Sequence, residues 1–484
     1  MLNMQVIIAQ IQKNNIDSAI LNDLITDHQI PHDKMISNYQ RYKASNTPDG
    51  VPIFSRKMPD VNKVNNKLNE AFDAEIIDVK LGYMIGNPII YELDKTLYTE
   101  NDVMDQDKYD LDIKVVRDFN KANNAEDLDG ETLKLASICG YGSRLLYIDK
   151  AGQTRMMNVK PWECIFITDG SINEAQYALR YYEIIDDGKK KIYVEWYDDK
   201  NISFYITADE IGKSSKKTPM MFIPYEKNGE TKIPHMFNGI PLIQFMNNEE
   251  LQGDCDKVYA DIDAYDRSMS DVNSEIETFR LAYMAIYGMN PTEEERLAAK
   301  QTGIFGLPDK ECKIEFITKE INDAAVEHHL DRLEKNIYRF GKSVNFDDIS
   351  FGGTVTGVAM KFKMFEMETK CIMSERKFTT ALRTQYKILA TVWSAKGSDI
   401  DYMNLNFVWT RNFPLNLVDE ADSTVKLKGL VSEKTRLGLL SFIDNPEKEM
   451  AAMEKDNLGM VDLNAPQFDE DGNVIEGGQE NGNV

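Results

Sequence analysis

The sequence predicts a mixed α+β protein in which helices flank a central β-rich region. Long stretches place apolar residues at helical spacing, and the clearest stretch keeps a strict spacing of four and three. Between residues 144 and 244, short alternating runs separated by Asp-Gly and Asn-Gly pairs replace this pattern, which is typical of antiparallel hairpins. The 484 residues, 42% of them hydrophobic, allow about two to four domains with packed cores.

The N-terminal part is predicted to be mostly helical. Residues 1–45 have the spacing of amphipathic helices, whereas the prolines and glycine of residues 46–60 indicate a loop. Helical spacing returns over residues 62–85, and Gly86 and Pro88 end that helix. Two further helices are expected before the β-rich region, at residues 109–120 and 129–138.

Two helices with narrow apolar stripes enclose a small module. The stripes run from Val258 to Phe279 and from Val326 to Val344. At ~1.5 Å per residue the first helix is about 35 Å long. Residues 281–320 read as a strand, a helix beginning at Pro291 and two more strands. The pattern predicts an α-hairpin with an α/β module at its tip, although an ordinary coiled-coil arm or bundle core fits the spacing equally well.

A glycine-containing segment, residues 344–357, follows the second stripe and predicts a flexible or tightly turning loop. Residues 358–396 contain neither proline nor glycine and predict one long helix of about 58 Å. This helix carries eight basic and three acidic residues. A solvated face or a surface for acidic partners, including neighbouring subunits, both explain that charge. The remaining predicted elements are a strand at 405–415, helices at 417–429, 432–443 and 446–456, and a disordered acidic tail at 461–484.

Composition excludes several classes of protein. With 80 acidic and 56 basic residues, the net charge of −24 argues against a protein that grips nucleic acid or an anionic membrane surface. No apolar stretch approaches the ~18 residues needed to span a membrane, and no signal peptide is expected. The five cysteines are far apart in the sequence and are predicted to be reduced, buried thiols.

No constellation of residues supports an enzyme. The sequence has no phosphate-binding loop, no nucleophile elbow and no metal-binding helix of known pattern. His328 and His329 are adjacent on a helix and point about 100° apart, which is poor geometry for joint metal binding. We therefore expect no catalytic, cofactor-binding or metal-ligating residues. A cytosolic acidic enzyme with an unrecognised site in the β-rich region stays an alternative.

Five segments, in this order, resemble the portal (head–tail connector) proteins of long-tailed double-stranded DNA bacteriophages, and together they cover most of the chain. They are VNNKLNEAFDAEIIDVKLGYMIGNPI (64–89), CGYGSRLLYIDKAGQTRMMNVKPWECIFITD (139–169), FMNNEELQGDCDKVYADIDAYDRSMSDVNSEIETF (245–279), DRLEKNIYRFGKSVNFDDISFGGTVTGVAMKFKMFEMETK (331–370) and LVSEKTRLGLLSFIDNPEKEMAAMEKD (430–456). The segment around residues 344–357 is the most specific, because it looks like the tunnel loop of that family.

The resemblance implies an α+β portal fold and a ring of about twelve subunits around a DNA channel. It divides the chain into a wing (1–248 and 358–414), stem helices (249–280 and 321–343), a clip (281–320), a tunnel loop (344–357), a crown (415–460) and the acidic tail (461–484). Such a ring sits in the virion at one capsid vertex, after assembly in the host cytoplasm. Its implied partners are double-stranded DNA read without sequence preference, terminase, a head–tail adaptor, and capsid and scaffold proteins. Another coiled-coil virion or scaffold protein stays the runner-up.

The resemblance also identifies candidate site residues. In a conduit, basic side chains would hold phosphate, whereas carboxylates would repel the duplex and let it slide. The tunnel-loop candidates are Asp347, Asp348, Ser350, Gly352, Gly353, Thr354, Val355 and Thr356. The acidic stem candidates are Asp256, Asp263, Asp266, Asp271, Glu275 and Glu277. Candidates for a basic inter-subunit helix are Lys361, Lys363, Arg376 and Lys377, and those for clip docking are Glu293, Glu294, Glu295, Arg296 and Lys300.

Overall fold

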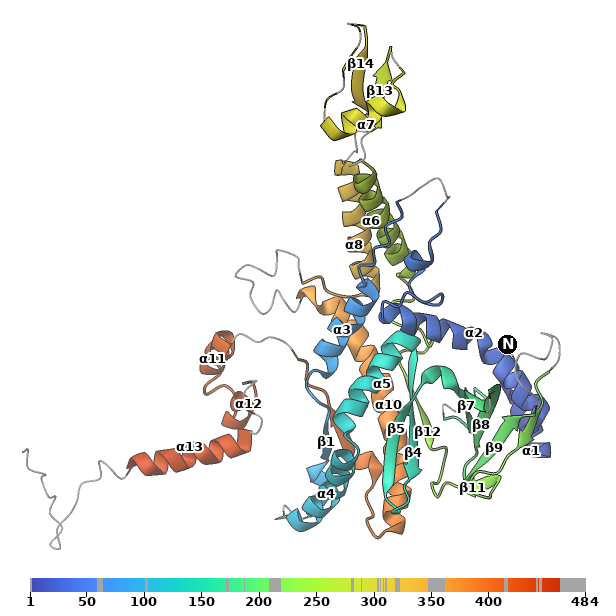
Figure 1. Ribbon diagram of the computed structural model, residues 1–484. Helices are drawn as coiled ribbons and strands as arrows, with labels where there is room; N and C mark the ends of the chain where they lie inside the picture. The colour runs from blue at the N-terminus through green and yellow to red at the C-terminus, as the bar shows by residue number, and fades with distance from the viewer. Residues whose placement is uncertain are drawn as a thin grey trace, which may run out of the picture. The chain divides into compact units, whose positions relative to one another are not determined.

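The protein is seen in a computed structural model that confirms the α+β class, with helices and small antiparallel sheets (Figure 1). The described residues are 2–58, 64–100, 103–170, 174–186, 188–208, 219–279, 283–288, 290–302, 304, 306–307, 309, 311–317, 323–346, 362–412, 417–440, 443 and 446–461. The chain forms two compact units, one of residues 1–347 with 363–412 and one of residues 348–362 with 413–484.

Two helices open the first unit and confirm the prediction for residues 1–45. They are α1 (Met4–Asn14) and α2 (Ser18–Tyr42). Asn3 and Asp17 cap them, because their side chains accept hydrogen bonds from the first free backbone N–H groups. The apolar faces pack on a sheet, where Leu21, Leu24 and Val194 are almost fully buried. A short 3-10 helix, η1 (Pro52–Ser55), lies in the predicted loop.

The β-rich region forms two antiparallel sheets, as predicted. The larger has the order β10-β9-β8-β7-β6, with β11 also paired to β9. Its strands are β6 (Cys164–Ile167), β7 (Tyr177–Asp186), β8 (Lys189–Tyr197), β9 (Asn201–Thr207), β10 (Phe222–Pro224) and β11 (Lys232–Pro234). The smaller has the order β12-β4-β5, formed by β4 (Tyr141–Ile148), β5 (Thr154–Val159) and β12 (Leu242–Met246). Gly152, in the predicted β4–β5 turn, has a φ of +73°, which favours glycine.

Helices α4 (Gln106–Ala122), α5 (Ala125–Cys139) and the long α10 (Phe365–Ala395) pack against the smaller sheet. Helix α3 (Phe72–Ile85) packs against α5 and α10. The aromatic rings of Phe245 on β12 and Phe378 on α10 lie 4.7 Å apart and join the sheet to the helix. The remaining short elements are β1 (Ile90–Leu93), paired with β15 (Leu405–Val408), β2 (Thr99–Glu100), β3 (Val103–Met104), η2 (Lys95–Tyr98), η3 (Pro161–Glu163) and η5 (Tyr402–Asn404).

A helical pair extends from this body and carries a small module (Figure 1). The pair is α6 (Tyr259–Phe279) and α8 (Asp323–Gly341), and the module contains β13 (Tyr283–Tyr287), α7 (Glu293–Thr302) and β14 (Lys313–Ile317). β13 and β14 pair antiparallel, as expected for a module inserted into an α-hairpin. The prediction of a second strand in the module, near residues 302–308, is wrong for the residues that the structure describes. Thr302 ends α7, and residues 304, 306 and 307 belong to no strand.

The described part of the second unit contains helices where they were predicted, namely α11 (Leu417–Lys426), α12 (Glu433–Leu437) and α13 (Pro446–Val461). The helix predicted at 432–443 is too long, because α12 ends at Leu437 and residues 438–440 and 443 are not helical. An ion pair between Lys434 and Glu447, 2.8 Å long, joins α12 to α13. The tail that follows residue 461 lies outside the described residues.

Two further expectations can be compared with this fold. All five cysteines are buried and free of disulfides, as predicted. In the described ranges, no helix is long and apolar enough to cross a membrane.

Candidate functional site

The helical pair buries its stripes best near the body. Ile262 on α6 and Ile337 on α8 are almost fully buried, whereas Ile276, near the far end of α6, is 51% exposed. One residue of the predicted apolar stripe on α8, Phe340, is not buried, because it is 54% exposed. Tyr338 is buried instead, and its ring packs against Phe72 of α3. The body therefore contributes to the burial of the α6–α8 pair at its base.

Residues 64–70, which we call the strap, lie in extended form along α6. The backbone N–H groups of Asn66, Leu68 and Glu70 donate to side chains of α6. Their acceptors are Ser274 Oγ at 3.0 Å, Ser270 Oγ at 2.9 Å and Asp266 Oδ1 at 3.1 Å. Two extended residues advance ~6.6 Å and four helical residues ~6 Å, so strap and helix stay in register.

The strap corrects the helix predicted over residues 62–85. Within the described residues of that range, helix begins only at Phe72. Val64 and Leu68 have helical spacing with Phe72, but the N–H groups around them are satisfied by α6. The spacing of apolar residues alone could not distinguish these two ways of satisfying the backbone.

Substitution of both strap acceptors is expected to loosen the strap. In a Ser270→Ala/Ser274→Ala variant, two part-buried N–H groups lose their acceptors, at about 1 kcal/mol each. Chemical unfolding followed by fluorescence measures the loss. Thr278→Ala is the matched control on the same helix, because its hydroxyl donates only to the carbonyl of Ser274 within α6. An equal effect of both changes would contradict the role given to the strap.

Most of the predicted acidic stem residues have partners in the N-terminal part of the chain. Lys34 and Asn38 contact Asp256, Arg41 contacts Asp263, Arg56 contacts Asp271, and Asn66 contacts Glu277. Helical geometry places Glu275 away from the strap. These contacts reduce the net charge that the first stem helix presents, and the proposed role of its carboxylates in a channel stays a prediction.

Asp266 is the most buried of these carboxylates. Its side chain is 1% exposed, and Oδ2 has no hydrogen-bond partner among the described residues. Burial, reinforced by the neighbouring charges of Asp73 and Asp263, raises the pKa of Asp266 to about 6, while the Glu70 N–H and Arg41 oppose the shift. The charged form is thus disfavoured in the folded chain.

Mild acid is expected to stabilise the folded chain through protonation of Asp266. Folding raises the pKa of Asp266, so the folded chain takes up this proton more readily than the unfolded chain. The resulting stabilisation grows as the pH falls through 6 towards 4 and is lost again at pH 7. We expect the free energy of unfolding to change by about 1–2 kcal/mol, after allowance for partial solvation. The measurement compares thermal unfolding of wild type and Asp266→Asn at pH 7 and pH 5. A pH response that is identical in both proteins would contradict this assignment.

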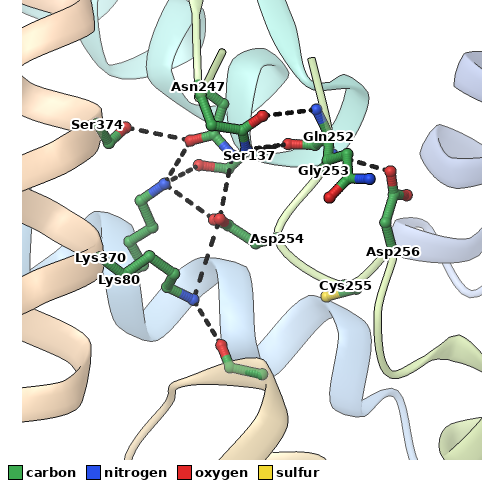
Figure 2. A network of polar contacts seen from close by, with 12 residues as sticks. Lys80, Ser137, Asn247, Gln252, Gly253, Asp254, Cys255, Asp256, Lys370 and Ser374 are labelled. Atoms are coloured by element: carbon green, nitrogen blue, oxygen red, sulfur yellow. Dashed lines mark hydrogen bonds and ion pairs between the residues drawn. The ribbon is translucent and has the colours of Figure 1, made fainter. Parts of the chain in front are cut away.

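A buried ionic cluster holds the base of the α6–α8 pair (Figure 2). Lys80 Nζ on α3 donates to Ser137 Oγ at 3.0 Å, Asn247 Oδ1 at 2.8 Å and Asp254 Oδ2 at 2.9 Å. Lys370 Nζ on α10 donates to the carbonyl of Gly341, at the end of α8, at 2.8 Å. It also lies 4.0 Å from Asp254 Oδ1. One carboxylate near the start of α6 thus joins α3, α10 and the end of α8.

The two lysines control the charge of Asp254. Burial alone would raise the pKa of this carboxyl group, but Lys370 and Lys80 overcome it and lower the pKa to about 2. Burial lowers the pKa of Lys370. Lys80 and Asp254 have side chains that are 0% and 2% exposed. The cluster therefore contains a carboxylate that is ionised at neutral pH and has almost no exposure to water.

The predicted tunnel-loop residues and Lys361 lie outside the described residues. Before them, Val344 is buried, and Asn345 donates to Glu334 of α8 at 2.6 Å. After them, Lys370 of α10 donates to the carbonyl of Gly341 at the end of α8. The described chain is therefore held at Val344 and Asn345 and again at Lys370.

The other described candidate residues lie at the surface or form ion pairs there. Lys377 forms an ion pair with Glu249 of its own chain, and the side chains of Arg376 and Lys363 are exposed. In the module, Glu294 is exposed, and Glu293 and Arg296 form an exposed ion pair 3.8 Å long. Glu295 and Thr292 cap α7 reciprocally, which gives Glu295 a structural role. The side chain of Lys300 is not among those described.

Sequence reasoning missed the ionic cluster. A signal was present, because Lys80 follows Phe72 and Ile76 at intervals of four residues on an otherwise apolar face. Its partners Asp254 and Lys370 carried no comparable signal. Across the described residues, no group of three or more His, Cys, Asp or Glu side chains is placed to hold a metal ion.

The fold is α+β, with the α6–α8 pair carrying a small module at its tip and the long α10 following α8 in the chain. Comparison with known families identifies the class of protein, because the family described as "Phage portal protein, SPP1 Gp6-like" matches residues 21–458. The chain belongs to this phage portal protein family. The portal protein of Bacillus phage SPP1 is 24% identical, over 94% of this chain and 90% of the relative. The portal protein of Clostridium phage phiCD119 is 26% identical, over 82% and 86%.

Proposed function

We propose that this portal protein assembles into a ring of about twelve copies at one capsid vertex. The ring is a passive conduit through which double-stranded DNA is packaged, retained and ejected. The α6–α8 pair forms the stem, and the module of β13, α7 and β14 is the clip on which terminase and then the head–tail adaptor dock. The protein needs no catalytic chemistry of its own for this task.

The observation that carries this proposal is the anchoring of the described chain on either side of residues 347–361, in a protein of the portal family. Val344 is buried before this segment, and Lys370, which follows it in α10, contacts Gly341 and lies 4.0 Å from Asp254. A loop that meets moving DNA must transmit force to a rigid support. The buried ion pairs supply that support, since separating them would leave uncompensated charges in the interior.

A second observation supports assembly with neighbouring copies. The first half of α10 exposes large apolar side chains, with Phe365 66%, Met373 53% and Ile372 36% exposed. Exposed Arg376 follows on the same face. Contiguous apolar surface on a soluble chain marks an interaction site. A neighbouring subunit in the ring would cover this face, and we propose that Arg376, rather than Lys377, contacts it.

Genetic complementation tests the proposed function. A phage that lacks the gene is expected to build capsids without DNA, and supplying the protein in trans should restore filled capsids. The control is a copy of the gene in which a stop codon early in α2 prevents production of the full-length protein. Capsids that fill with DNA in the absence of the protein would refute the proposal.

A further inference from the structure

Basic side chains cluster on one face of α8. They are the exposed residues Arg332, Lys335 and Arg339, and exposed Lys342 follows the end of the helix at Gly341. The spacing of three and four residues keeps the first three on one side of the helix. Leu333 and Ile337, which are buried toward α6, lie on the opposite side, since each residue turns the helix by about 100°. The basic face therefore points away from α6.

These four side chains lack acidic partners within the described residues, where ion pairs are otherwise common. Buried Arg41 contacts both Asp73 and Asp263, and Arg144 contacts Asp129. A run of unmatched cations is unexpected in a chain of net charge −24, because acidic side chains are in excess. The face is thus an unpartnered charged surface that fits an anionic partner.

The edge of α6 that faces neither α8 nor the strap, which we call the free edge, has the opposite character. It carries Asp261, Asp271, Glu275 and Arg267, and η1 packs beside Arg267 on part of it. Asp271 also pairs with Arg56 of its own chain but keeps a side chain that is 53% exposed. Between these charges lie the small residues Ala264 and Ser268. The edge therefore combines an acidic excess with room for long side chains to approach.

We propose that the basic face of α8 docks against the acidic free edge of α6 in a neighbouring copy of this chain. The inference rests on the proposed ring. A closed ring is built from heterologous contacts, which need two different and complementary surfaces on opposite edges of the subunit. The stem pair supplies these surfaces, one on each helix. Opposite charges across the contact also set the order in which subunits add and disfavour wrong registers.

The neighbouring stem is a better partner for this face than DNA. Four cations per subunit against the phosphate backbone would add affinity at every step and slow the passage of the duplex. Against a neighbouring α6 the same cations would balance an acidic excess that would otherwise repel between subunits. If the basic face binds a neighbouring α6, reversing its charge should weaken ring formation in the absence of DNA. If it binds DNA, ring formation without DNA should be unchanged.

Charge reversal tests the contact. The variant Arg332→Glu/Lys335→Glu/Arg339→Glu is expected to raise the protein concentration at which half of the chains assemble by about tenfold or more, as measured by mass photometry without DNA. The reciprocal change Asp261→Lys/Asp271→Lys/Glu275→Lys, introduced into the same chain, is expected to restore assembly. The matched control, Lys189→Glu/Lys190→Glu/Lys191→Glu on the β7–β8 hairpin, has the same net charge and is expected to assemble as wild type does.

The outcomes separate this contact from the proposed ring itself. If wild type forms no rings at any concentration, the proposed function fails. If wild type forms rings and the α8 reversal leaves assembly unchanged, or the control weakens it equally, the stem contact is overturned and the ring stands. Altered DNA passage through rings of unchanged stability would instead assign the basic face to the channel and overturn the contact.

A second measurement does not depend on the stability of the reversal variants. The native cysteines are all buried, so exposed cysteines introduced at Ala264→Cys and Lys335→Cys are the reactive ones. A short bismaleimide is expected to link assembled chains that carry both changes into a ladder of covalent oligomers. Each single variant should give only monomer or a trace of dimer. Monomer alone from the doubly substituted rings would overturn the contact.

Discussion

Asp254→Ala is expected to lower the free energy of unfolding by about 3–5 kcal/mol, the largest effect of any single substitution considered for this chain. The change removes the only carboxylate that contacts both Lys80 and Lys370 in Figure 2. Two ammonium groups would then remain in a site with almost no access to water. Chemical unfolding monitored by tryptophan fluorescence measures the loss.

Its matched control is an exposed ion pair. Lys190 and Glu183 pair across the β7–β8 hairpin with side chains that are 52% and 49% exposed. Glu183→Ala should therefore change the free energy of unfolding by less than about 1 kcal/mol. A loss of only that size for Asp254→Ala would show that water screens the cluster and that it does not hold the base of the stem.

The contribution of Asp254 also has a defined pH window. Its folded pKa of about 2 lies below the ordinary value of 3.8, so its stabilisation is present above that ordinary value and is lost as the pH falls towards 2. The shift corresponds to about 2 kcal/mol. Asp266 has the opposite sign at higher pH, which allows the two carboxyl groups to be separated in one titration.

Deletion of residues 347–356 is expected to leave rings intact and to abolish DNA packaging. The anchors of the segment lie outside the deletion, in Val344, Asn345 and Lys370, so the stem and α10 should keep their positions. The deletion removes the predicted loop groups Asp347, Asp348 and the residues that follow them. Electron microscopy of capsids and measurement of protected DNA give the readout.

An equal-length replacement is the control for the deletion. Glycine and serine in place of residues 347–356 keep the chain length and remove the carboxylates and β-branched side chains. Packaging by this replacement but not by the deletion would assign the role to the size of the loop rather than to its side chains. Full packaging by the deletion itself would contradict the placement of the loop in the channel.

Periodicity predicted most helices and hairpins because each of them buries one face locally. The stripes of α1 and α2 became the covering of the larger sheet, and the Ala151-Gly152 pair became a β-turn. The strap was wrongly predicted to be helical. The side chains that accept hydrogen bonds from its backbone N–H groups, Ser270 and Ser274, lie more than 200 residues away in the chain. A helix and an extended segment with apolar residues at every fourth position look alike until such partners are known.

The candidate site was predictable in outline and not in its electrostatics. The order of stem, module and loop followed from composition and spacing. The carboxylates of the first predicted stem helix were expected to form an acidic surface toward DNA. Arg41 and Arg56, which are far away in the sequence, instead contact two of them, Asp263 and Asp271. Formal net charge counts such carboxylates in full, although their fields are partly balanced. The unpaired basic face of α8 became visible only once these partners were assigned.

Cryo-electron microscopy of the purified protein, without DNA, tests the central claim most directly. The account predicts closed rings in which the α6–α8 pairs surround a central channel. Monomers or open chains at all concentrations would contradict it.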